Sequence, residues 1–253
     1  MPDIPAAPAR RPIVIIPARL ASTRLPGKPL ADIAGEPMIV HVWRRAIAAD
    51  VGPVLVAAAE PAIVQAVQAA GGQAVLTDPA HPSGSDRVFE ALSRRDPDAR
   101  HDVVINLQGD LPALDPALVR AALAPLAVAA VDIATLATPI AEAEDAADPN
   151  VVKAVLSLAP GATIGRALYF SRTPVPWGAG PHFHHIGIYA YRRAALARFI
   201  SLPPASLEQR ERLEQLRALE AGMRIDAALV DTMPLGVDTP ADLDRIRTFL
   251  ASP

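Results

Sequence analysis

Short runs of β-branched and aliphatic residues alternate along the chain with segments in which apolar residues recur at helical spacing. Strands are predicted at residues 13–16, 53–58, 74–77, 103–107, 133–137 and 225–230. Helices are predicted at 37–49, 61–70, 86–94, 116–126, 192–201 and 206–221, with a last helix opened by Thr239-Pro240. Since strands that alternate with helices form a parallel sheet covered on both faces, the pattern predicts an α/β fold with a mostly parallel, mixed sheet.

The segment 151–191 breaks this alternation. It is rich in strand-forming residues and is interrupted by prolines and glycines between residues 174 and 181, so it resembles an insertion. The acidic stretch 142–148 is expected to be a solvent-exposed helix or loop. With 253 residues, no internal repeat and no long linker, residues 1–253 are predicted to form a single domain. Residues 1–11 lack the apolar stretch of a signal peptide and are expected to be frayed.

Composition excludes several classes of protein. Half of the residues are hydrophobic (51%), 20% are charged, and the net charge is −3, which argues against a disordered chain or a basic nucleic-acid-binding protein. The most apolar stretch, 121–140, contains Pro125, Asp132 and Pro139, so a transmembrane helix is not expected. Cysteine is absent, which excludes disulfides and thiolate chemistry and favours a reducing, cytoplasmic location.

A cationic loop directly follows the first predicted strand. Residues 17–28, PARLASTRLPGK, place Arg19, Arg24 and Lys28 beside the hydroxyls of Ser22 and Thr23. Ligands of open α/β sheets bind at the carboxyl ends of strands, and guanidinium and ammonium groups neutralise phosphates there. The pattern indicates a triphosphate site, although a solvated basic loop would have the same composition. The loop lacks the Ser/Thr of a P-loop and the G-x-G-x-x-G of a dinucleotide site.

Two aspartates occupy comparable positions elsewhere. Asp110 ends the strand-loop segment VVINLQGD, and Asp238 lies in GVDTP before the last helix. Mg²⁺ is usually held by one or two carboxylates together with substrate phosphates, so the pair predicts a magnesium site; turn or helix-capping roles are the alternative. The histidines at 182, 184 and 185 have no further ligands at a regular spacing, so zinc is not favoured. Composition and spacing together indicate a metal-dependent nucleotidyltransferase.

Several motifs in order carry a family resemblance. They are IIPARLASTRLPGKPLADIAGEPMIVHV, HPSGSDR, INLQGD, HIGIYAYR, LEQLR and GVDTP, between about residues 13 and 247. The chain resembles the 3-deoxy-manno-octulosonate (Kdo) cytidylyltransferases, also called CMP-Kdo synthetases. The resemblance implies a nucleotide-diphospho-sugar transferase-like fold, a homodimer, Mg²⁺ dependence, and the reaction of CTP with Kdo to give CMP-Kdo and pyrophosphate for lipopolysaccharide synthesis.

The resemblance also assigns roles to residues. It places the CTP phosphates on Arg19, Ser22, Arg24 and Lys28, and the cytosine and ribose near Ser83, Gly84, Arg87 and Gln108. It gives Mg²⁺ to Asp110 and Asp238, and catalytic roles to Arg19, Lys28 and Asp110. It places the sugar acid on Arg172, His185, Tyr189, Glu214 and Gln215, within a segment 151–221 that contributes the sugar pocket and dimer contacts.

The residues alone say less about the sugar side. Strand alternation predicts that His185 and Tyr189 point the same way. Glu214 and Gln215 lie on a predicted amphipathic helix, where a solvated charged face is the ordinary explanation. The chain departs from the family at Leu111, where glutamate is frequent, and at Ala59, where aspartate is. Two alternatives therefore stay open: a cytidylyltransferase for another acidic sugar, such as 8-amino-Kdo or a sialic-acid-like nine-carbon acid, and a nucleotide-binding regulator without catalysis.

Overall fold

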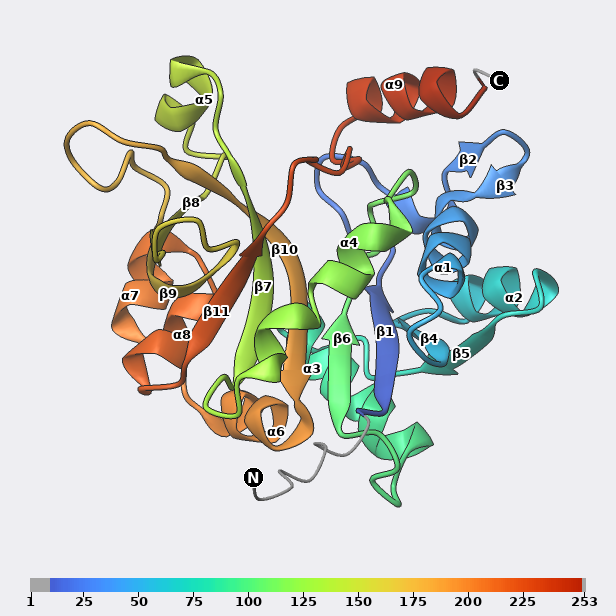
Figure 1. Ribbon diagram of the computed structural model, residues 1–253. Coiled ribbons are helices and arrows are strands. Elements are labelled where there is room, and N and C mark those ends of the chain that lie inside the picture. The colour runs from blue at the N-terminus through green and yellow to red at the C-terminus, as the bar shows by residue number, and fades with distance from the viewer. Residues whose placement is uncertain (1–9, 252–253) are drawn as a thin grey trace.

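A computed structural model describes residues 10–251, and across this range nine strands form one central sheet (Figure 1). In spatial order these are β5 (Gln73–Leu76), β4 (Val54–Ala58), β1 (Pro12–Ala18), β6 (Val103–Asn106), β10 (Phe183–Arg192), β7 (Ile133–Pro139), β11 (Ile225–Leu229), β9 (Ile164–Ser171) and β8 (Lys153–Ser157). Strands β5, β4, β1 and β6 run parallel, β7 and β11 are parallel to each other, and β10, β9 and β8 pair antiparallel to their neighbours. The predicted mixed α/β sheet is confirmed.

Helices cover both faces of this sheet. They are α1 (Met38–Ala48), α2 (Pro61–Ala69), α3 (Gly84–Arg95), α4 (Pro116–Ala121), α5 (Ala143–Ala147), α6 (Arg193–Ser201), α7 (Ser206–Glu211), α8 (Gln215–Glu220) and α9 (Pro240–Ala251), with 3₁₀ turns η1 (Lys28–Leu30) and η2 (Ala124–Ala127). Alternate β1 side chains enter different cores: Val14 and Ile16 pack with α1, α2 and α4, and Ile13 and Ile15 with α3, α6 and α8. This two-sided burial explains why the β1 sequence is continuously apolar.

A small satellite unit lies beyond the end of the main sheet. The hairpin β2 (Asp32–Ile33) and β3 (Glu36–Pro37) packs against α9, and Figure 1 shows both at the same corner of the molecule. Their shared core contains Ile33, Met38, Val237, Leu243 and Ile246. The sequence pattern predicts no strand at residues 32–37, because each strand of this hairpin has only two residues.

Three predicted helices have different limits in the structure. The predicted helix 206–221 is two helices, because Arg212 adopts a left-handed conformation (φ 54°, ψ 46°) between α7 and α8. The predicted helix 37–49 begins one residue later, since Pro37 is extended in β3. The predicted helix 116–126 ends at Ala121, and a 3₁₀ turn that contains Pro125 follows it.

The expected frayed leader is wrong for its last two residues. Arg10 donates to the carbonyl of Leu123 at 2.8 Å, and the backbone N–H of Arg11 donates to Asp102 at 2.6 Å. The rest of that prediction falls on residues 1–9, outside the described residues. Among residues 10–251, no helix combines the length and apolarity that crossing a membrane requires.

Candidate active site

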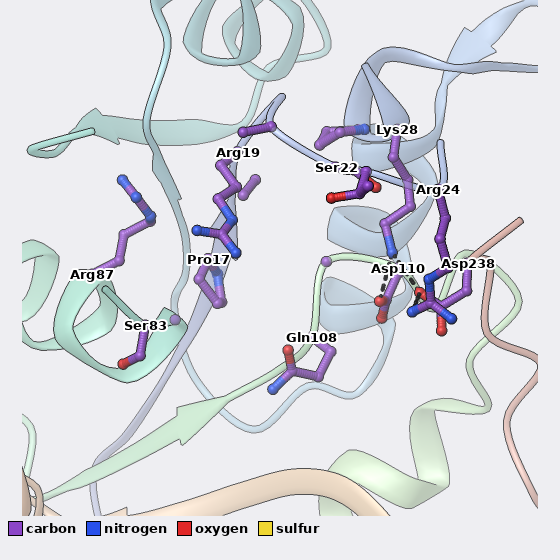
Figure 2. Close-up of a pocket in the computed structure, with 16 residues that line it drawn as sticks. Pro17, Arg19, Ser22, Arg24, Lys28, Ser83, Arg87, Gln108, Asp110 and Asp238 are labelled. Atoms are coloured by element: carbon purple, nitrogen blue, oxygen red, sulfur yellow. Dashed lines mark hydrogen bonds and ion pairs between the residues drawn. The ribbon is translucent and has the colours of Figure 1, made fainter. Parts of the chain in front are cut away.

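A cleft of about 400 Å³ opens at the carboxyl ends of β1 and β6. These strands are parallel neighbours, so the loops that follow them emerge at the same edge of the sheet. Figure 2 shows predicted nucleotide and metal residues from four separate segments around this cleft. The predicted residues that line it are Arg19, Ser22, Arg24, Lys28, Ser83, Gly84, Arg87, Gln108, Asp110 and Asp238.

Backbone geometry brings the two strand ends close together. A Cβ on Gly109 would lie 2.8 Å from the carbonyl oxygen of Pro17, so only glycine fits where the β6 loop crosses the end of β1. The cationic loop is closed by the N–H of Gly27, which donates to the carbonyl of Leu20 at 3.1 Å. Gly27 has a φ of 72°, a conformation that favours glycine. The loop therefore holds Arg19, Ser22 and Arg24 on the cleft wall.

Lys28 joins the two aspartates that lie far apart in sequence. Its Nζ donates to Asp110 Oδ2 at 2.9 Å, to Asp238 Oδ1 at 3.2 Å and to the carbonyl of Val237 at 2.9 Å. Arg24 Nη2 lies 3.1 Å from the same Asp238 oxygen. Figure 2 shows the side chains of Arg24, Lys28, Asp110 and Asp238 gathered at this point of the cleft. Burial alone would lower the pKa of Lys28, but the charges and hydrogen bonds of Asp110 and Asp238 outweigh it and raise that pKa. Lys28 is therefore a fixed cation between two carboxylates.

The donor set at this point fits a hard divalent cation. Two carboxylates converge where a lysine ammonium is already stabilised, so positive charge is favoured there. Among the described residues, no group of three or more His, Cys, Asp or Glu side chains forms a metal centre. Two carboxylates completed by substrate phosphates is the arrangement typical of Mg²⁺ in nucleotide sites. The structure confirms that Asp110 and Asp238, far apart in sequence, lie together beside the cationic loop.

The predicted nucleoside residues form the opposite wall. Ser83 caps α3, since its Oγ accepts the N–H of Asp86 at 3.2 Å, and Gly84 approaches Pro17. Arg87 is 2% exposed and donates to Thr77 Oγ1 at 2.7 Å and to the carbonyl of Asp78 at 3.1 Å.

Burial, opposed by Glu60 and reinforced by Arg19, lowers the pKa of Arg87. Arg87 therefore supports this wall as well as lining the cleft. Gln108 donates to the carbonyl of Gly187 at 3.3 Å and so links the end of β6 to β10.

The five predicted sugar residues do not line this cleft. The guanidinium of Arg172 donates to three backbone carbonyls. Nε donates to the carbonyl of Glu211 at 2.8 Å, Nη1 to that of Pro149 at 2.8 Å, and Nη2 to that of Arg212 at 3.3 Å. The carboxylate of Glu211 in turn accepts the backbone N–H of Arg172 and the hydroxyl of Ser171, both at 2.9 Å. Arg172 therefore ties the end of β9 to the break between α7 and α8.

His185 and Tyr189 lie on the same face of β10, as strand alternation predicts, with ring centroids 5.4 Å apart. His185 is 8% exposed, and its Nε2 lies 3.0 Å from Thr135 Oγ1. Burial, with a smaller effect from the charge of His184, lowers the pKa of His185 to about 3, so its imidazole is neutral at ordinary pH. Burial likewise raises the pKa of Tyr189.

The explanation by a solvated face is wrong for Gln215, whereas Glu214 is partly exposed, with a side chain 32% accessible. Gln215 is 7% exposed. Glu214 accepts the hydroxyl of Ser85 at 2.8 Å, in the first turn of α3 beside the cleft residues Ser83 and Gly84. Its other oxygen, Oε1, is buried and has no hydrogen-bond partner within residues 10–251. Arg217 Nη2 lies 3.9 Å from this oxygen, so Oε1 has a charged neighbour but no hydrogen bond, and it can accept one from a hydroxyl.

Two departures from the family pattern occupy ordinary structural positions. Leu111 is buried in the core beneath the cleft, and the backbone N–H of Ala59 donates to Ala18 at 2.9 Å at the end of β4. Three kinds of supporting residue were not predicted from the sequence. Thr77 and Asp78 accept hydrogen bonds from Arg87, and the carboxylate of Glu60 accepts the N–H of Leu20 at 3.0 Å. Asp242 accepts the backbone N–H groups of Asp238 and Thr239. The T-x-x-D spacing of a helix cap marks only Asp242 in advance.

Comparison with known proteins places this architecture in a family. A sequence model described as cytidylyltransferase matches residues 13–225. Curated proteins named 3-deoxy-manno-octulosonate cytidylyltransferase from Rhodospirillum centenum and Paramagnetospirillum magneticum are 68% and 65% identical. The two matches cover 97% and 94% of this chain, and 95% and 97% of those proteins.

Solved structures agree with the sequence matches. A CMP:2-keto-3-deoxy-manno-octonic acid synthetase complexed with CTP superposes with a TM-score of 0.87 at 43% identity, over 95% of this chain and 98% of that one. A cytidylyltransferase from Leptospira borgpetersenii, at 13% identity and a TM-score of 0.59, shares the fold over 95% of this chain and 86% of its own.

Fold and cleft together define a nucleotidyltransferase of the nucleotide-diphospho-sugar transferase-like class. Within this class, the chain belongs to the 3-deoxy-manno-octulosonate cytidylyltransferase family.

Proposed function

We propose that this protein transfers a cytidylyl group from CTP to Kdo, releasing pyrophosphate and CMP-Kdo for lipopolysaccharide synthesis. One observation carries the proposal: the cationic loop after β1 and the two aspartates share a single cleft with Lys28 bonded to both. It is supported by the relatives named for this activity and by the similar synthetase solved with CTP.

The triphosphate would lie against the cationic loop. Arg19, Arg24 and Lys28 supply the positive charge, and the hydroxyl of Ser22 donates to a phosphate oxygen. Because these groups are already positioned by the closed loop, they stabilise the charge that develops on the leaving pyrophosphate without further reorganisation. Arg19, Lys28 and Asp110 are the residues we assign to catalysis.

Asp110 and Asp238 would hold Mg²⁺. The ion, when bound, neutralises phosphate charge and polarises the phosphorus that is attacked. Before binding, Lys28 pairs with both carboxylates and Arg24 pairs with Asp238, and a nucleotide gives the Lys28 ammonium an alternative partner in the phosphates. The two aspartates would therefore be paired with cations in both states.

The reaction itself is a displacement at the α-phosphate of CTP. The anomeric 2-hydroxyl of Kdo attacks in line, a new oxygen–phosphorus bond forms, and the bond to the bridging oxygen breaks as pyrophosphate leaves. The chain's main contribution is positioning and charge neutralisation. Ser83, Gly84, Arg87 and Gln108 would hold the cytosine and ribose on the opposite wall.

Kdo would occupy the space between this cleft and the β10–α8 region. Glu214 would accept a sugar hydroxyl at Oε1, which has no hydrogen bond, and Gln215, His185 and Tyr189 would lie on the same side. Arg172 is proposed to orient this wall and the carboxylate of the acid. We further propose a cytoplasmic homodimer in which residues 151–221 provide dimer contacts.

A pyrophosphate-release assay tests the proposal. CTP, UTP and ATP are each combined with Kdo, 8-amino-Kdo and a sialic acid in the presence of Mg²⁺. We expect turnover with CTP and Kdo, and turnover that is at least about tenfold lower with the other pairs. Preference for another acid would identify a different sugar specificity. Tight CTP binding without pyrophosphate from any acid would identify a nucleotide-binding regulator instead.

A further inference from the structure

Asp238 reaches the cleft without the support of a strand. It lies beyond the end of β11, after an irregular connection at residues 230–237, whereas Asp110 directly follows β6. Its side chain is half exposed, and the ion pairs with Arg24 and Lys28 are the contacts through which its carboxylate is held. The orientation of this carboxylate therefore depends on what fixes its backbone.

The backbone around Asp238 is fixed by Asp242 in the first turn of α9. One carboxylate oxygen, Asp242 Oδ2, accepts the backbone N–H of Asp238 at 3.1 Å, and the backbone N–H and the hydroxyl of Thr239 at 2.9 and 2.8 Å. Thr239 Oγ1 accepts the N–H of Asp242 in return, at 3.2 Å. This reciprocal cap is one to four residues from the aspartate that lines the cleft.

The start of helix α9 is held in place by a small apolar core next to the capped residues. Val237 is fully buried among Leu243 and Ile246 of α9, Ile33 of β2 and Met38 of α1. Its N–H donates to the carbonyl of Asp110 at 3.0 Å, which joins the connection directly to the other aspartate. Figure 1 shows α9 outside the layers that cover the main sheet, next to β2 and β3.

We propose that Asp242 is a positioning residue for the metal-binding carboxylate of Asp238. Its charged oxygen gathers three donors from residues 238 and 239, and this fixes the direction in which the Asp238 side chain leaves the backbone. α9 thereby holds the carboxylate of Asp238, from the C-terminal part of the chain, next to the carboxylate of Asp110. The proposal rests on the proposed function, in which Asp238 binds the cation.

The test measures binding of Mn²⁺ in the presence of CTP, by the loss of the free-ion EPR signal. We expect Asp242→Ala to weaken Mn²⁺ binding at least tenfold and Asp242→Asn, which keeps one acceptor oxygen, to weaken it less. CTP binding without metal should be unchanged. In steady-state assays the Mn²⁺ concentration for half-activation should rise, while the KM for Kdo stays constant.

Asp244→Ala is the matched control, because Asp244 is an exposed carboxylate on the same helix, paired only with Arg247 through its side chain in the described structure. It should bind Mn²⁺ like the unmodified protein. Wild-type Mn²⁺ affinity in folded Asp242→Ala, or a lower melting temperature without weaker Mn²⁺ binding, would overturn the proposal. If Asp242→Ala does not fold, Asp242→Asn decides by the same criterion.

Asp238→Asn separates this proposal from the proposed function. If it weakens Mn²⁺ binding while Asp242→Ala and Asp242→Asn do not, Asp238 binds the cation and only the positioning role fails. If Asp238→Asn also binds Mn²⁺ normally, the metal assignment fails, and the positioning role fails with it.

Discussion

Charged residues have different partners at the cleft, the proposed nucleotide side, and around Arg172 and His185, the proposed sugar side. Around the cleft, Arg24, Lys28, Asp110 and Asp238 bond mainly to one another and face open space. On the sugar side, Arg172 is bonded to three backbone carbonyls, and His185 is buried and neutral. Charged side chains that are paired mainly with one another can exchange those partners for a charged ligand. Charged side chains that donate to backbone carbonyls stabilise the fold instead. We therefore expect substitutions to separate activity from stability on the first side and to couple them on the second.

The largest effect is expected for Asp110→Asn. Loss of one metal-binding carboxylate should lower kcat by about 10³-fold, equivalent to about 4 kcal/mol of transition-state stabilisation. The melting temperature should change little, because the side chain is part-exposed at the cleft. Pyrophosphate release and circular dichroism measure the two quantities. A near-normal kcat would remove Asp110 from the metal site.

Lys28→Met should lower kcat/KM by about 100-fold, since one preorganised cation at the phosphates is lost. In the absence of CTP, the same variant should bind Mn²⁺ more tightly than the unmodified protein, because no ammonium competes for Asp110 and Asp238. Isothermal titration gives the metal affinity. Weaker Mn²⁺ binding would show that Lys28 organises the carboxylates without competing for their site.

Arg172→Ala tests the other side of the comparison. Removing the hydrogen bonds from this guanidinium to three carbonyls, of which the bond to Glu211 is part-buried, should reduce the free energy of unfolding by about 1–3 kcal/mol. The KM for Kdo should also rise, while the KM for CTP stays constant. Arg166→Ala, on an exposed position of the same strand, is the control for loss of charge. An unchanged unfolding midpoint in urea would contradict the structural role of Arg172.

The most gradual effect is a pH dependence of stability that comes from His185. Its pKa is about 3 in the folded protein and about 6.5 when unfolded, so the unfolded state binds a proton first as the pH falls. The contribution to stability is complete above pH 6.5 and is lost below it, by about 1.4 kcal/mol per pH unit. Urea unfolding between pH 7 and pH 4 should show a slope that is steeper by about this amount in the unmodified protein than in His185→Gln. Equal slopes would place a charged, solvated imidazole at this position.

The sequence predicts the cleft better than the sugar side, because contacts between residues far apart in sequence leave no local pattern. Residues 17–28 and Asp110 directly follow buried strands, so the parallel-sheet rule places them together in advance. The hydrogen bond from Val237 to the carbonyl of Asp110 depends on a partner far away in sequence, and so does the bond from Arg172 to the carbonyl of Arg212 at the helix break. The same is true of the other carbonyls that engage Arg172, and no local pattern encodes them. Motif resemblance names sugar-side residues, but it does not reveal that several of them are buried or already bonded.

The most direct test of the central claim is a crystal structure with CTP and Mn²⁺, with the metal located by its anomalous scattering. We expect an anomalous peak in coordination contact with the carboxylates of Asp110 and Asp238 and with the CTP phosphates, and Lys28 turned toward those phosphates. A peak bound elsewhere, with Lys28 still bonded to both aspartates, would contradict it.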